Sequence, residues 1–145
     1  MIGLIQRVRS ASISVNQQSI SRINIGILLL LGVEKNDTNI ELEKLAKKVA
    51  NLRIFSDAEG KMNLNLLTVN GELLVVSQFT LVADTAKGNR PGFSNSAPPA
   101  LGESLYNDFI THFGSTYSPC KSGQFGANMQ VELINDGPAT FYLKV

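Results

Sequence analysis

The sequence predicts an α+β fold, in which one domain spanning residues 1–145 combines a predominantly antiparallel, barrel-like β-sheet with two helices. Short β-branched segments fill the first third of the chain, apolar residues recur at helical spacing in two later stretches, and alternation returns near the C-terminal end. Hydrophobic residues make up 43% of the chain and charged residues 17%, which is ordinary for a globular protein that buries one core.

We expect four strands in the first third of the chain, at residues 2–8, 11–15, 19–23 and 26–33. They are rich in β-branched and apolar residues and are separated by Ser, Asn and Gln. The fourth contains an uninterrupted apolar run between Gly26 and Gly32. Such a run indicates a strand that is covered on both faces.

A helix is predicted after residue 38. Thr38 and Glu41 have the spacing of a capping box, in which each side chain bonds to a free backbone amide of the first turn. Apolar residues then follow at helical spacing, with three lysines on the opposite face. The apolar residues are Leu42, Leu45, Ala46, Val49 and Leu52, and the lysines are Lys44, Lys47 and Lys48.

The middle of the chain predicts a β-hairpin and a long loop. Residues 63–68 and 72–79 read as strands joined through Val69-Asn70-Gly71, because Asn-Gly is a strong hairpin signal. Residues 83–99 hold several Gly, Pro, Asn and Ser residues and predict a long loop. Long loops inside compact domains usually carry function.

A second helix is expected after Ser96, which is placed to cap it, with Pro98 and Pro99 in the first turn. Its apolar stripe is Leu101, Leu105, Phe109 and Phe113, and Gly114 would end it. From Phe125 to Leu133 apolar and polar residues alternate as in a half-buried strand. Residues 135–138 would break this strand, and residues 139–145 would form the last one.

Composition excludes several classes of protein. The net charge of +1 does not indicate a duplex-binding protein, although a local basic patch would suffice for contact with one RNA end. The only cysteine, Cys120, fits a reducing cytoplasm. The longest apolar run is far shorter than the roughly 20 residues of a membrane helix, so we expect no membrane association. One cysteine and one histidine do not make a zinc site, and we expect neither a metal nor a cofactor.

Most candidate chemical groups have an ordinary structural interpretation. His112, the only histidine, falls on the second helix and is expected to pack or face solvent. Cys120 lacks a histidine partner, so an inert thiol is favoured although Lys121 follows it. Asp57 and Glu59 resemble part of a calcium loop, but the later ligands are missing and a solvated turn is favoured.

Two segments remain as candidates for a site. Ser77-Gln78-Phe79-Thr80 lies where an apolar strand meets the long loop, a place suited to lining a pocket, although Ser and Thr are common at strand ends. Gly137-Pro138 reads first as an ordinary turn. A cis Gly-Pro bond is the alternative, because cis costs only about 0.5–1 kcal/mol before proline and would hold a carbonyl in a fixed direction.

Taken together, these segments resemble the bacterial type of the D-aminoacyl-tRNA deacylase family. The most specific motifs are Ser77-Gln78-Phe79-Thr80-Leu81 and Asn135-Asp136-Gly137-Pro138-Ala139-Thr140-Phe141. Further matching motifs lie at residues 1–8, 31–35, 53–63, 123–125 and 129–131. Ala139 departs from the family pattern, which often has valine at this position.

The resemblance implies an enzyme that hydrolyses the ester of D-aminoacyl-tRNA, and of glycyl-tRNA as well, at the acceptor end of the tRNA. It implies a homodimer in which the turn Gly137-Pro138 enters the partner's pocket and excludes L-amino acids. Arg7 would hold this turn, and Phe79 and Phe125, with Met129, would contact the substrate. Lys87, Arg90 and Lys121, with Arg7, are the candidates for contact with tRNA phosphates.

The resemblance leaves the mechanism open within a catalytic set of Ser77, Gln78, Phe79 and Thr80. Thr80 could act as nucleophile, but the sequence offers it no base. We favour direct attack by water, helped by backbone amides near Phe79 and Thr80 and by the ribose 2′-hydroxyl of the substrate. There are two alternatives to an enzyme: a non-catalytic module that binds an RNA end or a nucleotide, and a purely structural dimer.

Overall fold

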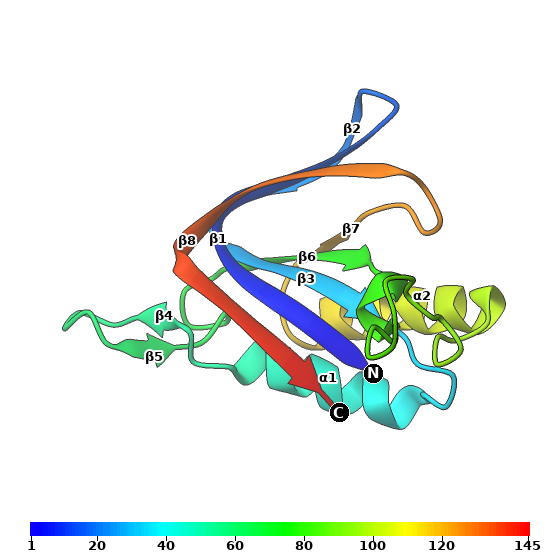
Figure 1. Cartoon of the computed structure of the whole chain (residues 1–145). Coiled ribbons are helices and arrows are strands. Elements are labelled where there is room, and N and C mark those ends of the chain that lie inside the picture. The colour runs from blue at the N-terminus through cyan, green and yellow to red at the C-terminus, as the bar shows by residue number, and fades with distance from the viewer.

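The strand β1 (Ile2–Val15) organises the computed structural model, which describes residues 1–145 (Figure 1). Its first half pairs antiparallel with β3 (Gly26–Gly32), and its second half pairs antiparallel with β2 (Gln18–Ile23). Along its opposite edge β1 pairs over nearly its whole length with β8 (Met129–Lys144). The expected strands 2–8 and 11–15 are therefore one continuous strand.

Two parallel pairings extend the sheet beyond β3. β6 (Glu72–Ser77) pairs parallel with β3, and β7 (Cys120–Ser122) pairs parallel with β6. Ser21 on β2 donates a hydrogen bond to the carbonyl oxygen of Ser122 on β7 over 2.8 Å, and Lys121 donates to the carbonyl of Arg22 over 2.7 Å. The six-stranded sheet thus curls into a nearly closed barrel, and the predicted α+β class is confirmed.

The helices α1 (Asn39–Asn51) and α2 (Pro99–Thr116) pack together against one face of this sheet. Leu29 on β3 and Val75 on β6 point toward the helices, whereas Leu28 and Leu74, one residue earlier, fill the interior of the barrel. This alternation is the two-residue period of a strand covered on both faces. The prediction that this apolar strand is covered on both faces is confirmed. No helix is long and apolar enough to cross a membrane.

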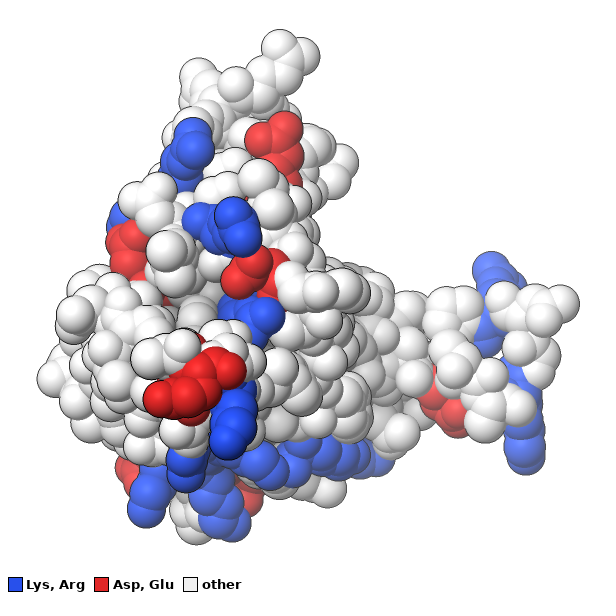
Figure 2. All heavy atoms as spheres, turned by 90° about the vertical axis from the view of Figure 1, so that its left-hand side faces the viewer, with Lys and Arg blue, Asp and Glu red and all other residues white.

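The predicted capping box at Thr38 is present. The Thr38 hydroxyl accepts a hydrogen bond from the backbone amide of Ile40, and the Glu41 carboxylate accepts from the amide of Thr38 over 3.0 Å. Lys44, Lys47 and Lys48 lie exposed on α1, and positive side chains gather along the lower edge of the molecule (Figure 2). The helix therefore begins where its local signals predict.

The predicted hairpin around Asn70-Gly71 is wrong. Only β5 (Met62–Leu64) is a strand there, and it pairs with the short β4 (Phe55–Ser56). Gly71 donates a hydrogen bond to the carbonyl of Leu66 over 2.9 Å, which closes a turn beneath the fully buried Leu66 side chain. β6 ends at Ser77 and is followed by a short 3-10 helix, η1 (Phe79–Val82).

Four further features of α2 and β8 differ from the predictions. Pro98 occupies the N-cap of α2 and Ser96 makes no cap, while Gly114 lies inside the helix, which runs to Thr116. β8 begins at Met129, so Phe125 lies in the preceding loop. β8 is not broken at residues 135–138, because the side chain of Asn135 accepts a hydrogen bond from the backbone amide of Ala139 over 2.7 Å. This bond bridges the irregular pairing with β1.

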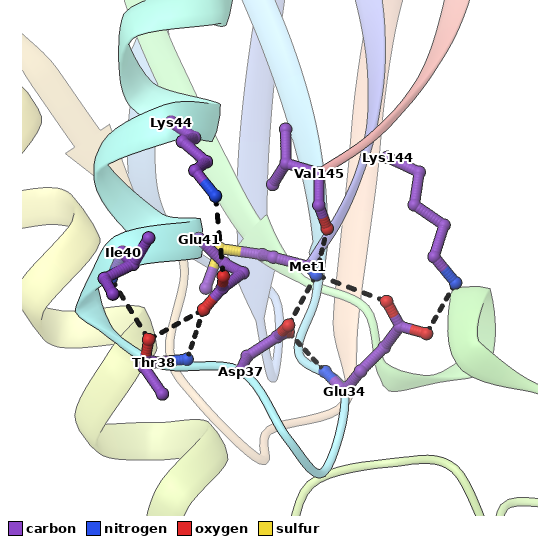
Figure 3. A network of polar contacts seen from close by, with 9 residues as sticks. All are labelled: Met1, Glu34, Asp37, Thr38, Ile40, Glu41, Lys44, Lys144 and Val145. Atoms are coloured by element: carbon purple, nitrogen blue, oxygen red, sulfur yellow. Dashed lines mark hydrogen bonds and ion pairs between the residues drawn. The ribbon is translucent and has the colours of Figure 1, made fainter.

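Both chain ends meet the connection between β3 and α1 (Figure 3). The Met1 ammonium donates to Asp37 over 2.6 Å, to Glu34 over 3.2 Å and to the carbonyl of Val145 over 3.2 Å. Lys144 pairs with the second oxygen of Glu34 over 2.7 Å. Burial alone raises the pKa of Glu34, but Lys144 and the Met1 ammonium outweigh it and the pKa is lowered.

Candidate active site

A cavity of about 560 Å³ opens at the ends of the parallel strands β3 and β6. Leu31 and Val76 form part of its apolar wall, and the chain between Ser77 and Phe79 crosses its mouth. Loops at the carboxyl ends of parallel strands commonly form binding sites. Three of the four residues of the predicted segment 77–80 therefore line the cavity, whereas Thr80 does not.

The turn from β6 into η1 determines how segment 77–80 is presented. The amide of Gln78 donates to the carbonyl of Leu31 over 2.8 Å, which continues the sheet for one more residue. The chain then enters η1, where the first amides of a helix have no partner inside the helix. The amides of Phe79 and Thr80 donate to no turn, loop or cap carbonyl. The Thr80 hydroxyl accepts a hydrogen bond from the Gln78 side-chain amide.

Helix α2 and the loop before β8 form the opposite wall. Gly102 lies on the buried face of α2, and a Cβ atom there would come within 3.5 Å of the Phe125 ring. The Phe125 ring lies 5.9 Å from that of Tyr106, whose hydroxyl donates to the carbonyl of Val75 over 2.9 Å. Desolvation by burial raises the pKa of Tyr106 to about 12. Tyr106 therefore stays neutral and supports the Phe125 ring from behind the cavity wall.

Met129, at the start of β8, completes the wall. Its sulfur would lie 2.5 Å from a Cβ atom on Gly123, so a side chain at residue 123 would displace Met129. Phe125 and Met129 thus line the same cavity as Ser77 and Gln78. The sequence alone did not identify Gly102 or Ser96 as lining residues. The sequence did contain one hint for Gly102, because a glycine inside a helix costs about 1 kcal/mol relative to alanine and therefore suggests a close contact at that position.

The Gly137-Pro138 turn lies away from this cavity. Its peptide bond is cis, and both residues are exposed. Arg7, which is 9% exposed, donates to the carbonyl of Asp136 over 2.8 Å and also to the carbonyl of Ile54. Arg7 pairs with Ile27 at one end of β3, whereas Ser77 pairs with Leu31 at the other end. Four residues of strand correspond to about 13 Å, so the two predicted segments are not brought together within one chain.

The predicted basic residues fall in different surroundings. Lys87 and Arg90 are exposed on the loop between η1 and α2, whereas Lys121 forms an ion pair with Glu72 over 2.9 Å. Arg7 is buried and satisfied by backbone carbonyls, which leaves it no access to a phosphate. Only Lys87 and Arg90 are therefore free to meet an external anion.

The remaining reactive groups lie outside the cavity. His112 is half-buried on α2 against the edge of the Tyr117 ring. Desolvation by burial raises the pKa of Cys120 to about 12, so the thiol stays protonated near neutral pH. No base thus stands beside Ser77 or Thr80, and a nucleophile of the Ser-His type is missing from the site.

Comparison with known proteins identifies the family. The family model described as D-Tyr-tRNA(Tyr) deacylase matches residues 4–144. The chain belongs to this deacylase family. A D-aminoacyl-tRNA deacylase of Pseudoalteromonas atlantica is 63% identical over 145 residues, and one of Haemophilus influenzae is 57% identical, with all of each chain covered. The deacylase therefore hydrolyses aminoacyl-tRNA and is of the bacterial D-aminoacyl type.

Two solved structures resemble the deacylase. The c-Myc DNA unwinding element binding protein is 42% identical, with a TM-score of 0.96 and coverage of 100% of this chain and 99% of the other. A probable eukaryotic D-amino acid tRNA deacylase has a TM-score of 0.82 at 17% identity, with 98% of each chain covered, and shows a shared fold. The predicted enzyme class is confirmed over a non-catalytic module, and tRNA is the macromolecular substrate.

Proposed function

We propose that the cavity holds the ester end of D-aminoacyl-tRNA and that the Gly137-Pro138 turn of a second copy closes it against L-amino acids. The observation that carries this proposal is the separation of the turn from the cavity of its own chain, at opposite ends of β3. An exposed turn fixed by a buried arginine is suited to act on a neighbour.

The outer face of β8 supports a homodimer. Ile134 and Tyr142 on this strand are 58% and 57% exposed, although large apolar side chains are normally buried. β8 pairs with β1 along one edge, and no other strand pairs with it. A two-fold contact along β8 would cover these side chains and carry each turn toward the other subunit.

The chiral selection follows because the Gly137-Pro138 turn places backbone atoms against the substrate. Gly137 has no side chain, and its carbonyl and that of Asp136 belong to a segment that Arg7 holds in place. A backbone oxygen cannot rotate away from a misplaced side chain, so an L-amino acid collides where a D-amino acid fits. Glycine has no side chain to exclude, and glycyl-tRNA is therefore also a substrate. Because aminoacyl-tRNA is a cytoplasmic substrate, we infer that the deacylase acts in the cytoplasm.

Water is the nucleophile in this proposal. The Thr80 hydroxyl has a lone pair committed to the Gln78 amide and no base to take its proton. The amides of Phe79 and Thr80 are free to stabilise the oxyanion that forms on the ester carbonyl. Aminoacyl esters are already activated, so orientation of the ester, these donors and the ribose 2′-hydroxyl suffice.

The proposal is tested with D-tyrosyl-, L-tyrosyl- and glycyl-tRNA. The wild-type deacylase should release D-tyrosine and glycine but not L-tyrosine. In Gly137→Ala the new Cβ would lie 2.9 Å from the Arg7 guanidinium at a φ of +140°, so the turn must shift and selectivity should fall. Gly60→Ala is the matched control, because Gly60 also has a positive φ but nothing lies within 4 Å of the added Cβ.

Mixed dimers test whether the turn acts across subunits. A Gly137→Ala subunit keeps its cavity, whereas a Gly102→Leu subunit keeps its turn but fills its cavity beside Phe125. If the turn serves the partner, refolding the two variants together should restore D-selective hydrolysis that neither has alone. Failure to restore selectivity for D-tyrosyl-tRNA in dimers of verified mixed composition would contradict the proposal.

A further inference from the structure

We propose that Phe93 and Phe79 form an aromatic platform at the mouth of the cavity, on which the penultimate nucleotide of the tRNA substrate stacks. This inference rests on the proposed function, because it takes the ester end to lie inside the cavity. Phe93 would then be a residue that positions the RNA strand outside the reacting centre.

The two rings are in contact and exposed. Their centroids lie 5.1 Å apart with planes tilted by 52°, and the side chains are 58% exposed for Phe79 and 40% for Phe93. Phe79 lines the cavity, so the pair stands on its rim. A nucleotide chain that leaves the cavity over this rim meets exposed rings, which can stack on a base of any kind.

The backbone holds Phe93 in this position. Asp84 and Gly92 exchange two hydrogen bonds of 2.8 and 2.9 Å, which close the loop immediately before Phe93. The carbonyl of Phe93 accepts a bond of 3.0 Å from the amide of Ser96, and the amide of the next residue, Ala97, donates to the carbonyl of Val33, directly after β3. The ring is therefore presented by an ordered segment, which limits the entropy lost when a base stacks on it.

The charge of the same loop complements RNA. Lys87 and Arg90 are exposed and form no ion pair, while the only acidic residue of the loop, Asp84, accepts a hydrogen bond from the amide of Ala86. In Figure 2 this loop is the arm at the right, with positive side chains near its outer end. Aromatic rings beside unpaired cations are the arrangement that binds single-stranded nucleic acid. The occupant we infer is the single-stranded acceptor end.

The experiment compares D-tyrosyl-tRNA with D-tyrosyl-adenosine, which carries the same ester on the terminal nucleoside but has no preceding nucleotide. The measured quantity is the ratio of kcat/KM for the two substrates. Phe93→Leu should lower this ratio about tenfold, the loss expected when one base–aromatic stack is removed. Phe93→Tyr keeps the ring and should keep the ratio. Met62→Ala removes a side chain that is 51% exposed on the distant β5 and is the control.

Two outcomes would overturn the platform. The ratio could stay unchanged in Phe93→Leu, as it would if both substrates lost activity equally. Alternatively, the variant could dissociate the dimer in light scattering, which would make the aromatic pair part of the subunit interface. Failure of the proposed function gives a different result, because Gly102→Leu would then leave the hydrolysis of D-tyrosyl-adenosine intact.

Discussion

Arg7 donates a hydrogen bond from Nε to the carbonyl oxygen of Asp136 over 2.8 Å, directly before the Gly137-Pro138 turn. A second nitrogen of the same guanidinium donates to the carbonyl of Ile54. The planar fork of arginine can reach two carbonyls at once, which a lysine ammonium cannot do in the same geometry. The position of the turn is therefore set by β1 and not by the turn residues alone.

Replacing Arg7 by lysine should loosen the turn. We expect Arg7→Lys to lower the free energy of unfolding by about 1.5–3 kcal/mol, since hydrogen bonds from a buried charged group are lost. The ratio of L-tyrosyl- to D-tyrosyl-tRNA hydrolysis should rise. Arg9→Lys is the control, because Arg9 also pairs with Asp136 but its side chain is 73% exposed. Urea denaturation measures the stability, and assays with the two substrates measure the selectivity. Unchanged selectivity in a destabilised Arg7→Lys would show that Arg7 supports the fold but does not position the Gly137-Pro138 turn for selection.

Removing the Thr80 hydroxyl should leave most of the activity. If water is the nucleophile, Thr80→Ala keeps both backbone amides and loses only the bond with Gln78. We expect kcat for D-tyrosyl-tRNA to fall less than about tenfold, well short of the 10²–10³-fold loss typical of removing an oxyanion donor. Single-turnover hydrolysis checks this, and a trapped acyl-enzyme on Thr80 in the wild-type protein would reverse our conclusion.

The salt dependence of tRNA binding should identify the cations that meet phosphate. The affinity for tRNA falls with salt, and each lost phosphate contact on a single strand makes the slope of log K against log salt shallower by about 0.7. Lys87→Gln and Arg90→Gln should each reduce the slope by this amount. Lys121→Gln should leave it unchanged, because Lys121 is already bound to Glu72 and to the carbonyl of Arg22. A slope that changes only in Lys121→Gln would place the RNA near Glu72, at the end of β6 that lies away from the cavity.

Cys120 should be unreactive in the folded protein. Burial raises its pKa from the ordinary 9.0 to about 12, so iodoacetamide at pH 7.5 should alkylate it far more slowly than the unfolded chain. The folded state binds the thiol proton more tightly than the unfolded state. The associated stability is therefore present below pH 9 and is lost as the pH rises toward 12. Rapid alkylation of the folded protein, followed by mass spectrometry, would contradict this environment.

The sequence predicts the elements whose signals are local. The capping box of Thr38 and Glu41 and the apolar stripe of α1 depend on neighbours within one or two turns, and both are present in the structure. The Asn70-Gly71 signal is equally local but misleads, because the partner of β6 is β3, which lies a long way back in the sequence. A parallel pairing leaves no mark in the turn that precedes a strand.

The candidate site was predictable only in part. The segment from Ser77 to Phe79 is next to the cavity because β6 ends there, and a strand end before a long loop is visible in the sequence. The position of Phe93 depends on a loop that closes through bonds between Asp84 and Gly92, and neither residue type predicts that pairing. The separation of Gly137 from Ser77 depends on the register of three strand pairings and becomes visible only in the folded chain.

β8 connects Met129, on the wall of the cavity, to the exposed turn at Gly137-Pro138 in one unbroken strand. In the symmetric dimer that we propose, each such strand therefore touches two substrates, its own at one end and its neighbour's at the other. A substitution that slid β8 along β1 would alter the size of one pocket and the stereochemical gate of the other in the same step. In that dimer, substrate fit and proofreading would be linked through a single strand.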